Sequence, residues 1–181
     1  MTWREETLEN LPVQIIDGDR GKNYPKQSEF FKNGYCLFLN TGNVTKSGFD
    51  FNNCQFITQD KDEKLRKGKL SRNDIVMTTR GTIGNVAYYH YKIGYENIRI
   101  NSGMVIFRVD YKEVLPKFFY LYLRSSRFKG QINNLRSGVA QPQLPIKDIK
   151  KIKISIPPIK TQNKIADILS KYDDLIENNR R

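Results

Sequence analysis

The turn within "TTRGTIGNVAYY" (78–89) contains residue types that contact nucleic acid. Arg80 stands at its edge beside Gly81, and Gly84 closes it. Three threonines crowd the same segment: Thr78, Thr79 and Thr82. Arginine and threonine side chains donate hydrogen bonds to phosphates and base edges. A phosphate-binding P-loop needs a Lys-Ser/Thr pair that opens a helix, whereas β-branched and aromatic residues follow Gly84. We therefore predict a hairpin turn that holds Arg80 and Thr82 out toward DNA.

Three other polar segments have a similar composition. They are "NTGNVTKSG" (40–48), "RINSG" (99–103) and "RSGVAQPQ" (136–143). Any one of them is most simply a solvated turn, but four such loops on one basic domain favour a shared binding surface. The candidate DNA-binding side chains are Asn43, Lys46, Thr79, Arg80, Thr82, Asn101, Arg136, Gln141 and Gln143. Others with the same donor chemistry are Asn40, Thr45, Arg99, Ser102 and Ser137.

The charge of the chain favours a polyanionic partner. Its 31 basic and 19 acidic side chains give a net charge of +12, of which +9 lies in residues 116–181. Such a field favours phosphate contacts on DNA, although a basic surface can also serve solubility alone. No apolar run reaches the roughly 18–20 residues of a membrane span, and the N-terminal stretch lacks the order of a signal peptide. We expect a soluble, cytoplasmic protein with reduced thiols and no membrane partner.

Residues that could support catalysis or bind a metal are few. The cysteines and the histidine are Cys36, Cys54 and His90. They match no zinc-binding spacing and give little support to a Ser-His-acid triad. "DEK" (62–64) resembles the acidic-x-Lys element of metal-dependent nucleases, with Asp50 as an upstream acid. A nuclease that uses Asp50, Asp62 and Lys64 is therefore one alternative. In a chain with 28% charged residues, a surface insert over 58–74 is the other.

The elements that must position these loops are predicted by hydrophobic periodicity. The predicted strands are 35–44, 74–79, 85–91 and 103–110, with 149–157 as a half-exposed strand. Residues 116–130 predict a helix, because Pro116 suits its first position and Gly130 its exit. Residues 133–145 are too rich in turn formers for regular structure. Together these elements predict an α+β fold in which a mixed β-sheet packs against helices.

The final segment (161–181) predicts an amphipathic helix. Thr161 can cap its N-terminus, and Arg180 and Arg181 suit its C-terminal end. Its apolar side chains repeat with a coiled-coil-like spacing: Ile165, Ile168, Leu169, Tyr172, Leu175 and Ile176. About two and a half heptads are short for autonomous pairing. A partner helix and packing against the chain's own domain therefore both stay open.

The C-terminal third resembles the junction found in Type I restriction-modification specificity subunits. In "LRSGVAQPQLPIKDIKKIKISIPPIKTQNKIADILSKYDDLIENN" (135–179), Gln141-Pro142 and Leu144 precede an Ile-Pro-Pro-x-x-x-Gln segment (156–162) and a long helix. "DIVMTTRGTIG" (74–84) and "NSGMVIFRV" (101–109) also fit that family, except that Asn73 stands where glycine is common. The resemblance covers essentially the whole chain and is strongest over 138–179.

This resemblance implies a sequence-specific DNA-binding subunit that performs no chemistry itself. Such subunits hold two target recognition domains apart on paired helices, and each domain reads half of a split DNA site. Adenine methyltransferase subunits and ATP-driven restriction subunits join them. On this basis residues 1–157 form a DNA target recognition domain, and residues 158–181 begin the conserved spacer helix. The chain itself binds no cofactor, and S-adenosylmethionine, ATP and Mg are expected on the partner subunits.

The chain resembles half of such a subunit, or a truncated form of one. A half-subunit could restore two-fold geometry as a homodimer through its helix, and would then read a palindromic split site. Two other classes of function stay open. One is the metal-dependent nuclease, and the other is an interaction module whose helix binds a partner while its basic face is incidental.

Overall fold

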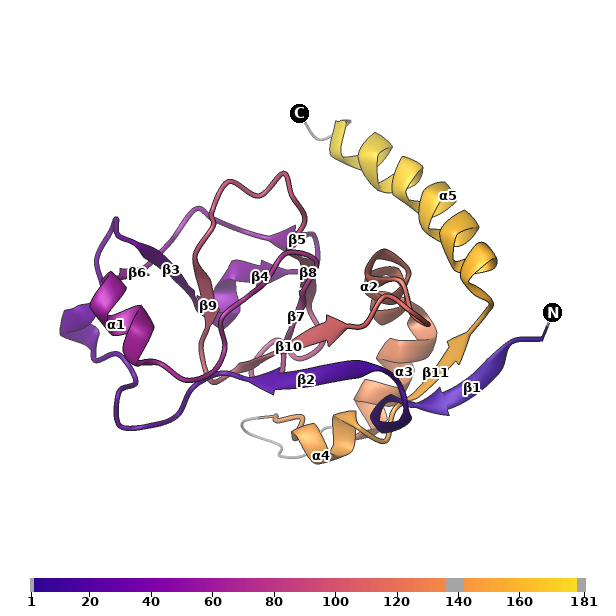
Figure 1. Cartoon of the computed structure of the whole chain (residues 1–181), viewed down its shortest axis with the longest axis horizontal. Helices are drawn as coiled ribbons and strands as arrows, with labels where there is room; N and C mark the ends of the chain where they lie inside the picture. Colours follow the sequence, from indigo (N-terminus) through magenta and orange to yellow (C-terminus); the bar gives the residue numbers. More distant parts are fainter. Residues whose placement is uncertain (1, 136–141, 179–181) are drawn as a thin grey trace.

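The computed structural model describes residues 2–135 and 142–178, with a β-rich body at one end and helices at the other (Figure 1). Its strands are β1 (Arg4–Thr7), β2 (Val13–Asp17), β3 (Cys36–Leu39), β4 (Val44–Thr45), β5 (Gly48–Phe49), β6 (Phe56–Ile57), β7 (Ile75–Thr78), β8 (Val86–Tyr88), β9 (Ile98–Ile100), β10 (Met104–Val109) and β11 (Lys153–Ile156). Its helices are α1 (Gln59–Lys64), α2 (Pro116–Leu123), α3 (Ser126–Leu135), α4 (Ile146–Ile149) and α5 (Ile159–Asn178), and 3-10 turns lie at Leu8–Asn10, Gln27–Glu29 and Thr41–Asn43. The predicted α+β fold is confirmed.

A four-stranded antiparallel sheet in the order β2-β10-β7-β8 forms the centre of the molecule. Within it, Ile106 pairs with Ile16 on one side and with Val76 on the other. Neighbouring side chains of a strand point to opposite faces, so Phe107 and Ile75 enter one hydrophobic cluster while Ile106 and Val76 enter another. Both faces of the sheet are therefore buried, which explains why β7 and β10 are almost continuous apolar runs.

A second sheet, in the order β6-β3-β9, covers one face of the central sheet. Strands β3 and β9 run parallel while β3 and β6 run antiparallel, so this sheet is mixed, as predicted. Leu37 and Ile98 pack toward the central sheet, whereas Phe38 packs outward against α1 through Leu65. Helix α1 begins where the Thr58 hydroxyl accepts the amide of Lys61 (3.2 Å). The charged insert is thus a short capped helix and a loop.

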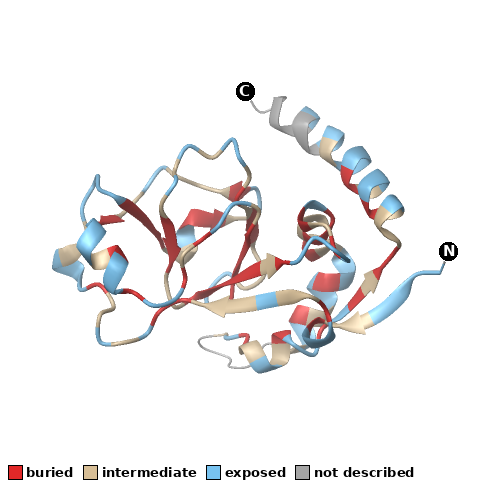
Figure 2. Cartoon of the chain, in the orientation of Figure 1, coloured by how far each residue is buried: buried red, intermediate tan, exposed pale blue. Residues whose placement is uncertain are grey.

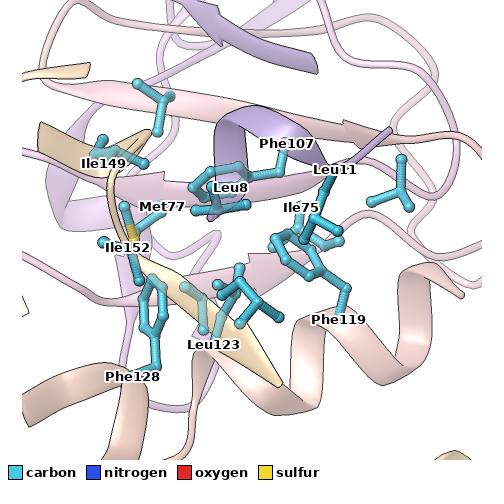
Figure 3. Packing of buried hydrophobic residues seen from close by; sticks show 14 of the residues in the cluster. Leu8, Leu11, Ile75, Met77, Phe107, Phe119, Leu123, Phe128, Ile149 and Ile152 are labelled. Carbon is cyan, nitrogen blue, oxygen red and sulfur yellow. The ribbon is translucent and has the colours of Figure 1, made fainter. Parts of the chain in front are cut away.

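Helices α2 and α3 cover the other face of the central sheet (Figure 3). The rings of Phe107 and Phe119 meet edge to face at 5.6 Å, and Phe128 brings α3 into the same cluster. Pro116 is the first residue of α2, as predicted. The predicted helix end at Gly130 is wrong, because the first helix ends at Leu123 and Gly130 lies inside α3.

The segment before the C-terminal helix forms less strand than expected. Residues 146–149 are helical, so β11 is limited to 153–156, where it pairs antiparallel with β1. Leu135 ends α3 inside the segment that was expected to be irregular. Helix α5 begins at Ile159 and not after a Thr161 cap, because the Pro158 carbonyl already accepts the amide of Thr161 (2.8 Å).

Gln162 fastens α5 to the rest of the domain. Its fully buried side chain accepts the amide of Leu115 (2.8 Å) and donates to the carbonyls of Glu113 (2.8 Å) and Pro157 (2.9 Å). Beyond Ala166, the residues of α5 whose burial is described are exposed or half-buried (Figure 2). A coiled coil requires a second helix, so the coiled-coil expectation stays a prediction. Within the described ranges, no helix is both long and apolar enough to cross a membrane.

Candidate nucleic-acid interface

The turn between β7 and β8 has the hairpin geometry that its sequence predicts. Gly81 and Gly84 have φ values of +67° and +87°, in the left-handed region that favours glycine. Buried Thr78 holds the turn from inside: its hydroxyl donates to the Thr82 carbonyl and accepts the amide of Asn85 (3.1 Å). Arg80 and Thr82 are exposed at the tip. The turn is therefore a rigid support for two exposed donors.

The loop before β10 lies directly against this turn. The Gly103 carbonyl accepts the amides of Thr79 (2.8 Å) and Arg80 (3.2 Å). A Cβ atom at Gly103 would lie 2.8 Å from Thr41 Cγ2 and 3.8 Å from Arg80 Cβ, so a larger residue would force Thr41 to shift. Asn101 shapes the same loop by accepting the amide of Gly103 (2.9 Å). Parts of three predicted loops thus meet around one glycine.

The fourth predicted loop reaches the turn through Gln143. Arg80 and Gln143 lie opposite each other in an antiparallel β-bridge, and the Leu144 amide donates to the Thr79 carbonyl (2.9 Å). Leu144 is buried in the hydrophobic cluster of the helical side and fixes this strand-like segment in place. The exposed side chain of Gln143 therefore lies beside that of Arg80.

Arg20 joins this surface although its sequence context gave no sign of it. A Cβ atom at Gly18 would lie 2.2 Å from the Asn101 carbonyl oxygen, so the loop after β2 packs tightly on the 101–103 loop. Arg20 donates to the Ser102 carbonyl (3.2 Å) and pairs with Asp17 (3.2 Å), while half of its side chain stays exposed.

The loop that carries Arg20 is held by a buried carboxylate. Burial opposes ionisation of Asp19, but backbone N–H groups of Gly21 (2.6 Å) and Arg66 (2.8 Å) donate to it and lower the pKa of this carboxyl. Only the pattern Asp-x-Gly hinted at this turn in the sequence.

We use the name hairpin surface for the exposed and half-exposed set Arg20, Thr41, Arg80, Thr82, Asn101, Ser102 and Gln143.

Some residues that were predicted to face DNA serve the fold in this structure. Asn43 is buried, and its amide donates to the carbonyls of Asp50 (2.9 Å) and Asn53 (3.0 Å). The side chain of Thr79 is also buried. Both residues thus shape their loops and do not present a side chain to a ligand. Lys46 is exposed but lines a cleft at another place on the surface. Arg136 and Gln141 lie outside the described residues.

Arg99 is not a loop residue but part of a buried ion pair. Its guanidinium donates to both the carboxylate and the main-chain carbonyl of Asp62, and Lys69 pairs with the same carboxylate. Burial opposes ionisation of Asp62, but hydrogen bonds from Lys69 and Arg99 outweigh it and lower the pKa of this carboxyl. This ion pair joins α1 to β9.

This arrangement contradicts the nuclease alternative. The carboxylate of Asp62 faces two cations inside the protein, Lys64 pairs with Asp60 on the surface of α1, and Asp50 caps the amide of Asn52 (2.9 Å). In the part of the chain that the structure describes, no three His, Cys, Asp or Glu side chains are grouped to hold a metal ion. The three residues do not form one site.

The predicted stripe on α5 is largely exposed. Ile168, Leu169, Tyr172 and Leu175 are between 43% and 60% exposed, and Ile165 is half-buried. The side chain of Ile176 lies outside the described residues. An apolar helix face of this kind is typical of a surface that binds a second helix. Among the described residues no second helix covers this face, so the pairing stays a prediction.

Comparisons with known proteins agree on one family. The family model for the Type I restriction modification DNA specificity domain matches residues 13–181. The specificity subunit of the Type I restriction enzyme EcoBI of Escherichia coli is 27% identical over 97% of this chain and 36% of its own length. The specificity subunit of the MjaVIII enzyme of Methanocaldococcus jannaschii is 29% identical over 93% of this chain and 40% of its own length.

A solved structure shows the same fold. The S subunit of a Type I restriction-modification system from M. genitalium superimposes with a TM-score of 0.69 at 20% identity, over 98% of this chain and 41% of that one. The chain therefore spans about two fifths of the length of these relatives.

Proposed function

Because the chain belongs to the family of Type I restriction modification DNA specificity domains, we propose that it binds duplex DNA and reads one half of a split target. The observation that carries this proposal is the convergence of Arg80, Asn101 and Gln143 on one surface. Arginine pairs well with guanine edges, and asparagine and glutamine pair well with adenine edges. A hairpin and a short loop are also small enough to enter a major groove.

The scaffold supports direct readout of bases. Hydrogen bonds of 2.8–3.2 Å join the hairpin to the 101–103 loop, and Leu144 fixes the segment that carries Gln143. Donors on a preorganised support lose little conformational entropy on binding. The net charge of +12 supplies the affinity for phosphates that does not depend on sequence.

We also propose a partner role for α5. Its exposed apolar face fits a second helix, either from another copy of this chain or from a longer specificity subunit. The complex would then dock an adenine methyltransferase subunit, which carries S-adenosylmethionine, and a restriction subunit, which uses ATP and Mg. In this proposal the chain contributes recognition and no catalysis of its own, and it acts in the cytoplasm.

Co-expression with a methyltransferase subunit, followed by genome-wide mapping of methyladenine, tests the proposal. A split methylated motif that depends on this chain is the expected result. A stable complex that methylates no defined motif would overturn it.

Exchange of Leu169 and Tyr172 for glutamate tests the helix, and sedimentation should show loss of the dimer or of the partner complex. DNA affinity that is unmeasurable at low salt, with a partner complex still formed, would instead identify an interaction module.

A further inference from the structure

A large cleft lies at the far end of β8 from the hairpin turn. It has a volume of about 890 Å³ and separates the β4–β5 hairpin and the loop after β8 from helices α2 and α5. In Figure 1 these elements lie toward the upper side of the molecule, whereas α4 lies at the lower side. None of the hairpin-surface residues lines this cleft.

The walls of the cleft carry cations from three separate elements. Lys46 comes from the β4–β5 hairpin, Lys92 from the loop after β8, and Lys117 from the first turn of α2, and all three are exposed. Arg124 and His90 line the cleft as well. Among the lining residues that the structure describes, none is acidic. A cleft that is lined by cations and has low-dielectric walls focuses a positive potential into its space.

Aromatic rings line the cleft together with these cations. Tyr88 and Tyr120 stack at 5.5 Å with an angle of 24° between their planes, and the guanidinium of Arg124 lies 5.1 Å from the ring of Tyr120. Burial raises the pKa of Tyr88 to about 12, so its hydroxyl stays protonated and donates to Asn73 (2.6 Å). Tyr91 is 81% exposed at the rim. Flat apolar surface beside cations is suited to deoxyribose next to phosphate.

Arg72 holds the loop that forms one wall. Its guanidinium donates to the carbonyls of His90 (3.1 Å) and Ile93 (2.8 Å) and lies 4.2 Å from the ring of Tyr89. This clamp fixes the loop backbone on both sides of Lys92. This wall of the cleft is therefore preorganised.

The distance between the cleft and the hairpin turn suits one DNA strand. Gly84 in the turn and Tyr88 at the end of β8 are four positions apart in the sequence, which at about 3.3 Å per residue is at most roughly 13 Å. Successive phosphates of one strand advance about 3.4 Å along the duplex axis, so this distance corresponds to about four base steps. A duplex whose axis runs parallel to the buried strand β8 can thus reach both places.

We propose that this cleft binds the sugar-phosphate backbone of the duplex whose bases the hairpin surface reads, with Lys46, Lys92 and Lys117 on its phosphates. The inference rests on the proposed function and adds a second contact that carries affinity without sequence preference. It separates the roles of two predicted DNA-binding residues, because Lys46 contacts phosphate while Arg80 contacts bases.

The test measures the salt dependence of binding to a fluorescein-labelled 30-bp duplex of random sequence. The full chain is compared with a triple variant, K46Q/K92Q/K117Q, and with a charge-matched control at exposed lysines near α1 and β6, K26Q/K32Q/K67Q. Each phosphate contact adds about one to the slope of log K against log salt, so the cleft triple should lower this slope by about two to three. Affinity near 0.1 M salt should fall at least about tenfold, and the K46R/K92R/K117R variant should keep the wild-type slope.

The possible failures point to different conclusions. If the chain binds DNA but the cleft triple and the control triple change the slope equally, the cleft has no special role and this inference is wrong. If the cleft triple keeps the full slope, the inference is wrong as well, while the proposed function stands. If the unaltered chain shows no DNA binding at low salt, the proposed function itself fails.

Discussion

Arg80 and Gln143 lie opposite each other in an antiparallel β-bridge, although they are far apart in the sequence. The bridge joins the tip of a hairpin to the segment that leads into α4. It places the guanidinium-bearing side chain of one exposed residue next to the amide-bearing side chain of another. This relationship is the basis for assigning base readout to the hairpin surface.

We expect Gln143→Ala to weaken the preference of the chain for its specific site without reducing its affinity for random DNA. Loss of one base-edge contact costs about 1–3 kcal/mol on a specific site and little elsewhere. Competition binding between selected and random duplexes measures the difference. Lys32→Ala, an exposed change near β6, serves as the control and should leave both affinities unchanged. Equal preferences for Gln143→Ala and the parent chain would remove Gln143 from the readout.

The close approach at Gly103 makes a steric prediction. Gly103→Ala places a methyl group 2.8 Å from Thr41 Cγ2, and overpacking of this kind costs about 1–3 kcal/mol. We expect a matching loss in urea unfolding and weaker DNA binding, because the Arg80 amide bonds to the Gly103 carbonyl. Adding Thr41→Ser removes the clashing methyl and should recover part of both losses. A double variant that is no better than the single one would show that the contact is not the cause.

Gln162 is expected to be the residue of α5 that matters most for stability. Gln162→Ala leaves the amide of Leu115 and the carbonyls of Glu113 and Pro157 without their partner, at about 1–3 kcal/mol for each buried group that stays unpaired. Equilibrium unfolding in urea measures the total. Asn163→Ala, one residue along and exposed, should change the free energy of unfolding by less than about 0.5 kcal/mol. Similar values for the two variants would contradict this role.

The Asp62–Arg99 pair predicts a dependence of stability on pH. The pKa of the Asp62 carboxyl is lower in the folded protein than in the unfolded chain, so its stabilising effect is fully present above the unfolded value and is lost as pH falls through the folded one. Asp62→Asn leaves Arg99 buried without its counter-charge and should cost about 3–5 kcal/mol near pH 7.

The stability difference between Asp62→Asn and the parent chain should shrink as pH falls below about 4, where the Asp62 carboxyl of the unfolded chain takes up its proton while the folded carboxyl, with its lower pKa, is still ionised. Denaturant unfolding at a series of pH values follows this difference. Asp60→Asn, which affects only an exposed pair with Lys64, should have little effect at any pH. A difference for Asp62→Asn that stays constant from pH 7 to pH 3 would show that the ion pair is not its source.

The sequence predicted the local elements well where one physical preference dominates. The β7–β8 hairpin follows from two glycines between β-branched runs, and the start of α2 follows from Pro116. The prediction of a helix end at Gly130 fails, because the end of α2 at Leu123 depends on how Phe119 and Phe128 both reach the same hydrophobic cluster. Such a helix end is decided by tertiary packing and leaves no local signal.

The site was predicted less completely, because residue type does not determine direction. Asn43 and Thr79 have the right chemistry for DNA but are buried, and the Asn43 amide donates to backbone carbonyls. Arg99 has a carboxylate partner, Asp62, that only the fold brings close. Arg20 reaches the hairpin surface through a contact between Gly18 and the Asn101 carbonyl that no spacing in the sequence shows.

Selection of bound duplexes from a random library tests the central claim most directly, with the parent chain and Arg80→Ala compared side by side. We predict that the parent chain enriches a short motif and that Arg80→Ala loses the preference at one or two positions of it. Binding of Arg80→Ala to random DNA should change little by comparison. An identical motif from both proteins, with the variant folded, would contradict the claim that the hairpin surface reads DNA sequence.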